Sequence, residues 1–152
     1  MTASVPNGGS RPPAPSRALT RWAWGILGGL LLESFLGMGL NLYVTLPGSP
    51  TFTQVFVSVP LLTAHIVLGF VLLAASVVFL LRARGSGVVG VPWRAALVVV
   101  FVLLALQEGF SFTFTQNAAF SYGMVVGFLG AVAFQATILY QLGRAAPAPA
   151  SA

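Results

Sequence analysis

Four long apolar stretches dominate this chain and limit what it can fold into. Each has the roughly 20 residues that an α-helix needs to cross about 30 Å of hydrocarbon at about 1.5 Å per residue. The stretches cover about residues 22–46, 56–81, 92–110 and 120–142. We therefore predict an all-α, polytopic membrane protein, with a four-transmembrane-helix bundle formed by residues 19–144.

The low share of charged residues supports this prediction. Only 6% of the 152 residues are charged, against roughly 25% in soluble domains. Most of the surface must therefore face lipid, and the lipid bilayer is the predicted partner. The net charge of +5 does not indicate nucleic-acid binding, because no basic patch is interleaved with aromatic residues.

The arginine residues predict an orientation. All basic residues of the chain are Arg: Arg11, Arg17, Arg21, Arg82, Arg84, Arg94 and Arg144. The connections near residues 47–55 and 111–119 contain neither Arg nor Lys, so all positive charges fall on one side of a four-helix bundle. The positive-inside rule then predicts a multi-pass protein of the cell inner (plasma) membrane with both termini in the cytoplasm. Residues 1–18 and 145–152, rich in Pro, Gly, Ser and Ala, are predicted to be disordered tails.

An acidic residue interrupts the first stretch near its middle. It belongs to a series at i+4 spacing: Gly25, Gly29, Glu33, Gly37 and Asn41. An ionisable group at mid-membrane costs on the order of 2.5–3.5 kcal/mol, so Glu33 is expected to face the bundle. Two interpretations follow. Glu33 is a proton carrier or ligand contact, or it forms a neutral hydrogen bond between helices with His65, Asn41 or a Thr hydroxyl.

His65 is the one histidine of the chain and lies in the second stretch. One interpretation is a neutral imidazole that is hydrogen-bonded inside the bundle. The others are a proton relay and an axial haem ligand. A haem b held by His65 needs a second ligand, either Met124 of the fourth stretch or the His65 of a second copy in a homo-oligomer.

Several polar residues lie in the outer half of the predicted bundle or at its edge: Asn41, His65, Gln107, Glu108 and Asn117. If the first three helices are neighbours, these residues converge near Glu33 on a pocket that opens toward the outer leaflet. Such a pocket suits a quinone head group, a haem or a small amphipathic ligand. For Glu108 the alternative is simple hydration, because it lies close to the predicted interface.

No soluble-enzyme motif is present. The chain has no Walker loop, Rossmann fingerprint, HExxH or GxSxG motif, and no acidic pair surrounds its histidine at metal-ligand spacing. Cysteine is absent, which excludes disulfides and thiolate metal sites. We therefore predict no metal site and favour a non-enzymatic role.

Four segments carry a family resemblance. They are ESFLGMGLNLYVTLP (33–47), HIVLGFVLLAAS (65–76), QEGFSF (107–112) and SYGMVVGF (121–128). They resemble small four-helix membrane proteins of prokaryotes, which are distantly similar to one four-helix half of haem A synthase, where an outer-side pair of histidines binds haem. The resemblance implies a ligand position at His65. The histidine expected on the fourth helix is missing, and Leu61 and Leu62 stand where an acid is expected one turn before His65.

The segment GGLLLESFLG (28–37) also resembles the small multidrug-resistance transporters. That family uses a mid-membrane Glu of its first helix for proton-coupled export, so the resemblance implies a proton-coupling role for Glu33.

Three function classes remain open. The first is a haem- or quinone-associated protein, such as an accessory subunit of a larger membrane redox complex. The second is a proton-coupled small-molecule transporter centred on Glu33. The third is a structural or assembly bundle in which the polar residues only join helices.

Overall fold

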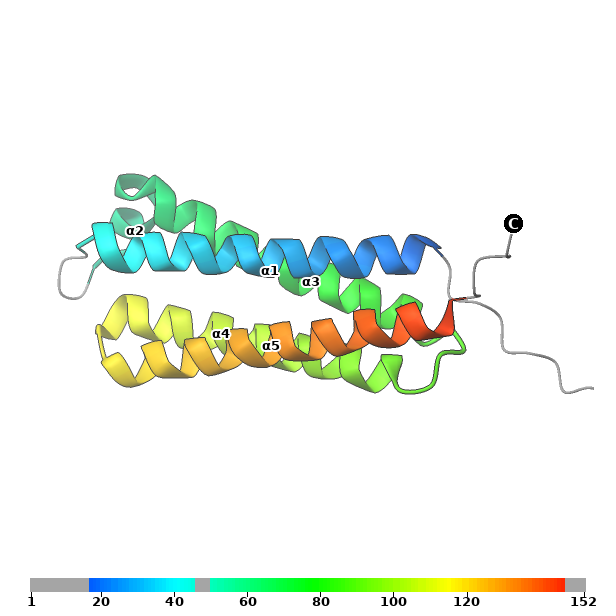
Figure 1. The fold of residues 1–152 in the computed structure, drawn as a ribbon. Helices are drawn as coiled ribbons and strands as arrows, with labels where there is room; N and C mark the ends of the chain where they lie inside the picture. Colours follow the sequence, from blue (N-terminus) through cyan, green and yellow to red (C-terminus); the bar gives the residue numbers. More distant parts are fainter. Residues whose placement is uncertain (1–16, 46–49, 147–152) are drawn as a thin grey trace, which may run out of the picture.

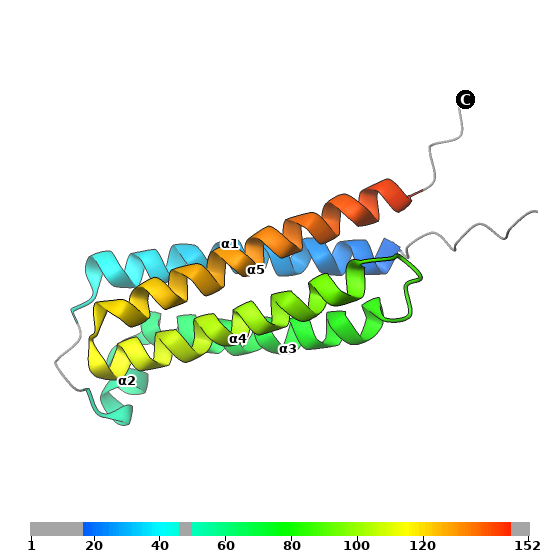
Figure 2. The same cartoon turned by 90° about the horizontal axis from the view of Figure 1, so that it is seen from below.

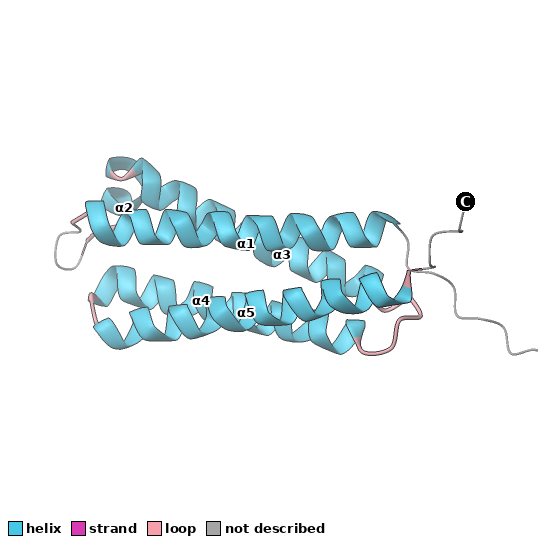
Figure 3. Ribbon diagram, viewed as in Figure 1, coloured by secondary structure: helices cyan, strands magenta, loops and turns pink. Residues whose placement is uncertain are grey.

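The computed structural model describes residues 17–45 and 50–146, except the side chains of Phe52 and Ser58. Its helices are α1 (Arg17–Tyr43), α2 (Phe52–Ser58), α3 (Pro60–Ala83), α4 (Val91–Thr115) and α5 (Ala118–Ala145). These residues contain no strand (Figure 3), and α1, α3, α4 and α5 are each long and apolar enough to cross a membrane. The prediction of an all-α chain with four such helices is confirmed. Arg11 and most of the predicted tails, residues 1–16 and 147–152, lie outside the described residues.

A separate short helix precedes α3, where the sequence predicts one segment over residues 56–81. Proline lacks an N–H, and its ring disfavours a helical conformation of the residue before it. Val59 accordingly has φ −129° and ψ 80°, which ends α2 and lets Pro60 begin α3. α2 itself begins with a capping box, in which Thr51 and Gln54 each accept a hydrogen bond from the other's backbone N–H. The single predicted segment is therefore two helices.

The connection between α4 and α5 is much shorter than the loop predicted over residues 111–119. Hydroxyl groups in the last turns of α4 donate to carbonyls one turn back, from Ser111 to Gln107, from Thr113 to Gly109 and from Thr115 to Ser111. These bonds satisfy the polar side chains inside the helix, so the polar sequence continues α4. Gln116, at φ 55°, ends α4, and the Asn117 side chain accepts the Ala119 N–H at the start of α5.

The four long helices form an up-and-down bundle. Around the bundle the order is α1, α3, α4 and α5, and α5 returns to pack against α1 (Figures 1 and 2). α2 packs on α3 at one end of the bundle, which we call the α2 end. The first turn of α1 and the last turn of α5 lie together at the other end.

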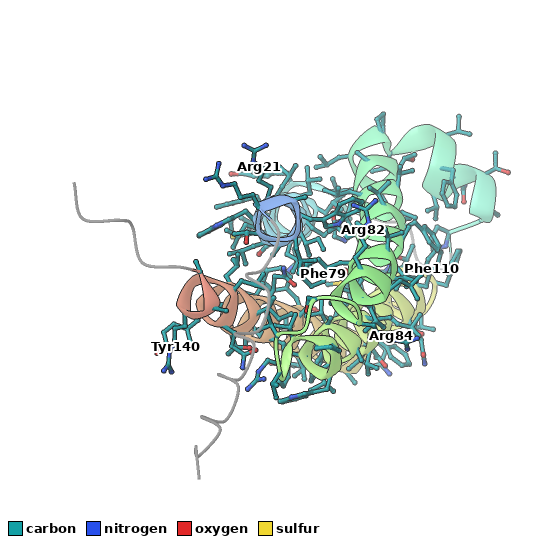
Figure 4. All side chains as sticks on the ribbon, turned by 90° about the vertical axis from the view of Figure 1, so that its right-hand side faces the viewer. Arg21, Phe79, Arg82, Arg84, Phe110 and Tyr140 are labelled. Atoms are coloured by element: carbon teal, nitrogen blue, oxygen red, sulfur yellow. The ribbon has the colours of Figure 1, made fainter. Side chains whose placement is uncertain are left out.

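That other end, the arginine end, holds every arginine that the structure describes. These are Arg17, Arg21, Arg82, Arg84, Arg94 and Arg144. Figure 4 looks onto this end and labels three of them. The guanidinium of Arg82 lies 4.3 Å from the centroid of the Trp22 ring, and that of Arg94 lies 4.4 Å from the Trp93 ring. Arg beside Trp is typical of helix ends at a membrane interface.

The larger apolar core fills the arginine half of the bundle, and a smaller buried cluster of Val55, Leu62 and Ile66 lies in the α2 half. Phe79, Ile138 and Leu142 lie at the centre of the larger core, with at most 1% of their surface exposed. The last layer of this core toward the α2 end has one residue from each long helix. These are Leu30, Leu72, Val102 and Ala131. Beyond this layer the helices enclose a pocket.

A buried hydrogen bond ties α5 to α1 within the core. Nε2 of Gln135 donates to the carbonyl oxygen of Ala23 at 2.8 Å, and the Gln135 side chain is fully buried. Polar contacts between membrane helices contribute about 0.6 kcal/mol on average, so this bond supports the packing without dominating it. It joins α1 and α5 in the arginine half.

α4 and α5 approach each other closely at Gly127. A methyl group at Gly127 would lie 2.7 Å from the backbone nitrogen of Ala105 and 2.9 Å from the carbonyl oxygen of Phe101. Backbone atoms cannot move aside as the tip of a side chain can. A glycine is therefore required for this approach, and small residues at such contacts are typical of helix pairs in membranes.

We expect Gly127→Ala to lower the thermal unfolding midpoint in detergent, with a loss of about 1–3 kcal/mol from overpacking. Circular dichroism during heating measures it. Gly28→Ala is the matched control, because no atom lies within 4 Å of a Cβ at Gly28. This control should leave the midpoint unchanged or raise it slightly. An equal loss at both positions would contradict the close approach.

Candidate functional site

A pocket of about 540 Å³ lies between the four long helices in the α2 half of the bundle. Its floor is the last layer of the core. Its walls are mainly apolar and include the rings of Phe110, Phe112 and Phe128 from α4 and α5. An apolar pocket of this size, with a few polar groups, is typical of a site for a small organic molecule.

Glu33 of α1 and His65 of α3 meet at the wall of this pocket. Nδ1 of His65 lies 3.1 Å from Oε1 of Glu33, and the two side chains are 18% and 15% exposed, respectively. Both residues line the pocket. Of the partners predicted for Glu33, the structure therefore brings His65 to it.

Two glycines make room for this contact. A Cβ at Gly37 would lie 3.2 Å from Cε1 of His65, and a Cβ at Gly69 would lie 3.2 Å from Oε1 of Glu33. Each glycine follows the polar residue of its own helix by one turn, so in the antiparallel α1–α3 pair each polar side chain lies against the glycine of the other helix. The i+4 series of α1 therefore supplies both the acid and the space for its partner.

The pair is short of other polar partners. Oε2 of Glu33 is buried and has no hydrogen bond within the described residues. Nδ1 of His65 is buried too and lies 3.1 Å from Oε1 of Glu33, with no hydrogen bond to another group of the described residues. No Arg or Lys of the described chain lines the pocket. His65 is thus the one basic group that these residues offer to Glu33.

The other predicted site residues fall in different places. Asn41 and Met124 line the pocket, while Gln107 and Glu108 do not. Gln107 is exposed, and the carboxyl group of Glu108 lies over Gly123 of α5. The helical period explains this result: α4 presents other residues to the pocket, and the two polar residues lie on a different face. The lining residues of α4 nearest to them are Ala105, Leu106, Gly109, Phe110, Phe112 and Thr113.

Five polar lining residues were not predicted from the sequence. They are Ser34, Thr45, Thr113, Gln116 and Ser121. Thr113 and Gln116 fall in the segment predicted as a loop, and their position depends on the extension of α4. Ser34 could have been predicted as a lining residue, because it lies in the same helical turn as Glu33.

The pocket lining does not fit a haem b. His65 and Met124 both line the pocket, but the two propionate groups of a haem carry negative charge. Within the described residues the lining offers them no Arg or Lys, and it contains Glu33. Carboxylates held in an apolar pocket without a cationic partner are strongly disfavoured.

Comparison of the chain with protein-family models, with curated proteins and with solved structures finds no significant match.

We expect Glu33 and His65 to be coupled in stability. A double-mutant cycle with Glu33→Gln and His65→Gln should give an interaction free energy of about 0.5–3 kcal/mol, measured by equilibrium unfolding in mixed micelles. The matched control is a second cycle that pairs Glu108→Gln with His65→Gln. The Glu108 carboxyl group lies over Gly123 of α5 and not beside His65. The control pair should be additive. Additivity of both pairs would show that the contact contributes nothing to stability.

Proposed function

We propose that this chain is an integral membrane protein that binds a neutral amphipathic molecule of the quinone class in its pocket. The observation that carries the proposal is the Glu33–His65 contact at the wall of an apolar pocket. In this proposal both termini lie in the cytoplasm, and the α2 end faces the opposite side of the membrane.

Membrane insertion is supported by the apolar surface of the bundle. Large apolar side chains are exposed on every long helix, for example Phe35 at 65%, Val71 at 55%, Leu103 at 52% and Leu129 at 58%. In water these surfaces would be unfavourable, whereas in lipid they need no cover. The orientation is supported by the arginine end, because positively charged residues favour the cytoplasmic side.

The polar atoms of the pair suit a ligand with hydrogen-bond acceptors. In the Glu33–His65 ion pair the imidazolium carries a hydrogen on Nε2. The same holds for the neutral arrangement in which the Glu33 carboxyl group donates to Nδ1 of His65. In both arrangements Nε2 can donate to a carbonyl oxygen of a quinone ring.

The absence of positive charge supports a neutral ligand. The lining contains no Arg or Lys in the described part of the chain and contains Glu33, so it does not favour an anionic molecule. The proposal covers binding. Oxidation or reduction of the ring would need an electron-carrying partner, which agrees with the predicted role as an accessory subunit of a larger complex.

The orientation can be tested directly because the chain has no cysteine. Ala119→Cys lies at the α2 end, and Val89→Cys lies in the connection between α3 and α4. Both side chains are exposed, so a thiol at either position is accessible to reagent. In intact bacterial spheroplasts, a membrane-impermeant maleimide should label Ala119→Cys and should label Val89→Cys only after permeabilisation. The reverse pattern would place the arginine end outside.

The ligand class can be tested by binding of a tritiated methylated benzoquinone to protein in nanodiscs, with empty nanodiscs as the blank. The wild-type protein should bind it, and His65→Leu should weaken binding about 5–100-fold, as expected for the loss of one or two hydrogen bonds in an apolar pocket. Glu108→Gln is the control and should not change the affinity. Binding to His65→Leu and to the wild type with equal affinity would exclude the pair as the anchor.

A further inference from the structure

The exposed side chains that line the pocket lie on one side of it. They are Met38, Asn41, Thr45, Gln116 and Val125. All belong to α1 and the residues just after it, to α5, or to the turn between α4 and α5. No exposed lining residue comes from α3 or α4 in the described chain. Met38 and Val125 therefore mark a place where the pocket meets the surface between α1 and α5, while Thr45 and Gln116 lie at its α2 end.

Side chains close the other three boundaries between neighbouring helices at this level. The rings of Phe70 and Phe110 meet between α3 and α4, with 5.9 Å between their centroids. The Glu33–His65 contact closes the boundary between α1 and α3. Between α4 and α5, a Cβ at Gly109 would lie 3.3 Å from Sδ of Met124.

α1 and α5 are joined in the arginine half of the bundle and not beside the pocket. The hydrogen bond from Gln135 to Ala23 joins these helices within the core, on the arginine side of the pocket floor. Toward the α2 end, the pocket lies between them instead. In Figure 1 the two helices are accordingly farther apart at the α2 end than at the arginine end.

The opening extends from the α2 end toward the middle of the helices. Met38 precedes Tyr43, the last residue of α1, by about five residues, which is roughly 8 Å along the helix. Val125 follows Ala118, the first residue of α5, by about seven residues, or roughly 10 Å. If the helix ends lie among the lipid head groups, Met38 and Val125 lie at the depth of the acyl chains. They are 54% and 47% exposed, respectively, so both side chains reach the surface as well as the pocket.

We propose that the ligand enters the pocket sideways from the lipid, between α1 and α5, and that it is a long-chain quinone whose chain stays in this opening. This inference rests on the proposed function and specifies its ligand. The pocket volume of about 540 Å³ accommodates a ring head group but not a long isoprenoid chain. Met38 and Val125 offer the chain an apolar path into the bilayer, and the ring reaches Glu33 and His65.

Two neighbouring valines of α5 provide a matched test in the cysteine-free chain. Val125 lines the pocket, whereas Val126 is also exposed, at 57%, but is not among the lining residues. Val125→Cys and Val126→Cys are each reacted with a bulky, membrane-permeant maleimide. Binding of two tritiated probes is then measured in nanodiscs: a methylated benzoquinone without a chain and the same ring with a decyl chain.

The modified Val125→Cys protein should bind the decyl quinone at least about tenfold more weakly, because the bulky group occupies the opening that the chain must fill. Its affinity for the chainless ring should change less than about twofold. The modified Val126→Cys protein should bind both probes as the unmodified protein does.

Two other results would overturn this inference while leaving the proposed function intact. Equal weakening of both probes by modification at Val125 would mean that the opening has no separate role for the chain. Unchanged binding of both probes would place the entrance elsewhere, for example at the α2 end. Failure of the wild-type protein to bind either probe would instead refute the proposed function, and this inference with it.

Discussion

The contact between Glu33 and His65 is the interaction on which the rest of the α2 half depends. An acid at mid-depth in an apolar bundle needs a partner, and His65 is the one basic residue that lines the pocket within the described chain. Gly37 and Gly69 leave the space that the two side chains occupy. The pair therefore joins α1 to α3 at this level, together with the packing of Leu40 on the cluster of Leu62 and Ile66, and it provides the polar wall of a mainly apolar pocket.

The two halves of the bundle are packed in different ways. In the arginine half, apolar side chains from all four long helices fill the centre, and Gln135 joins α5 to α1. In the α2 half, α1 packs on α3 through the polar pair, and α5 packs on α4 around Gly127. These two helix pairs enclose the pocket between them, so α1 and α5 border an opening rather than a packed interface.

The structure of the pocket favours some of the functions that the sequence leaves open over others. The pocket offers a neutral ring head group the polar side chains of Glu33 and His65 and an apolar enclosure, whereas its described lining offers no Arg or Lys to the propionates of a haem. Proton-coupled transport centred on Glu33 stays a prediction. It would require the packed core around Phe79 and Ile138 to open toward the arginine end during a transport cycle. A purely structural bundle accounts for the glycines and Gln135, but it gives no role to an open pocket.

The sequence by itself determined that the chain is helical, with four apolar helices of membrane-spanning length, because hydropathy and helix length are properties of each segment alone. It also determined that Glu33 should face the interior, because the cost of exposing an acid to lipid does not depend on the fold. Only the tertiary structure decided that His65 is the partner of Glu33, that Gln107 and Glu108 lie away from the pocket, and that the pocket opens between α1 and α5. Periodicity tells which residues share a face, but the distances between helices decide which faces meet. Those distances depend on contacts between residues far apart in the chain, such as Gly127 with Ala105 and Gln135 with Ala23.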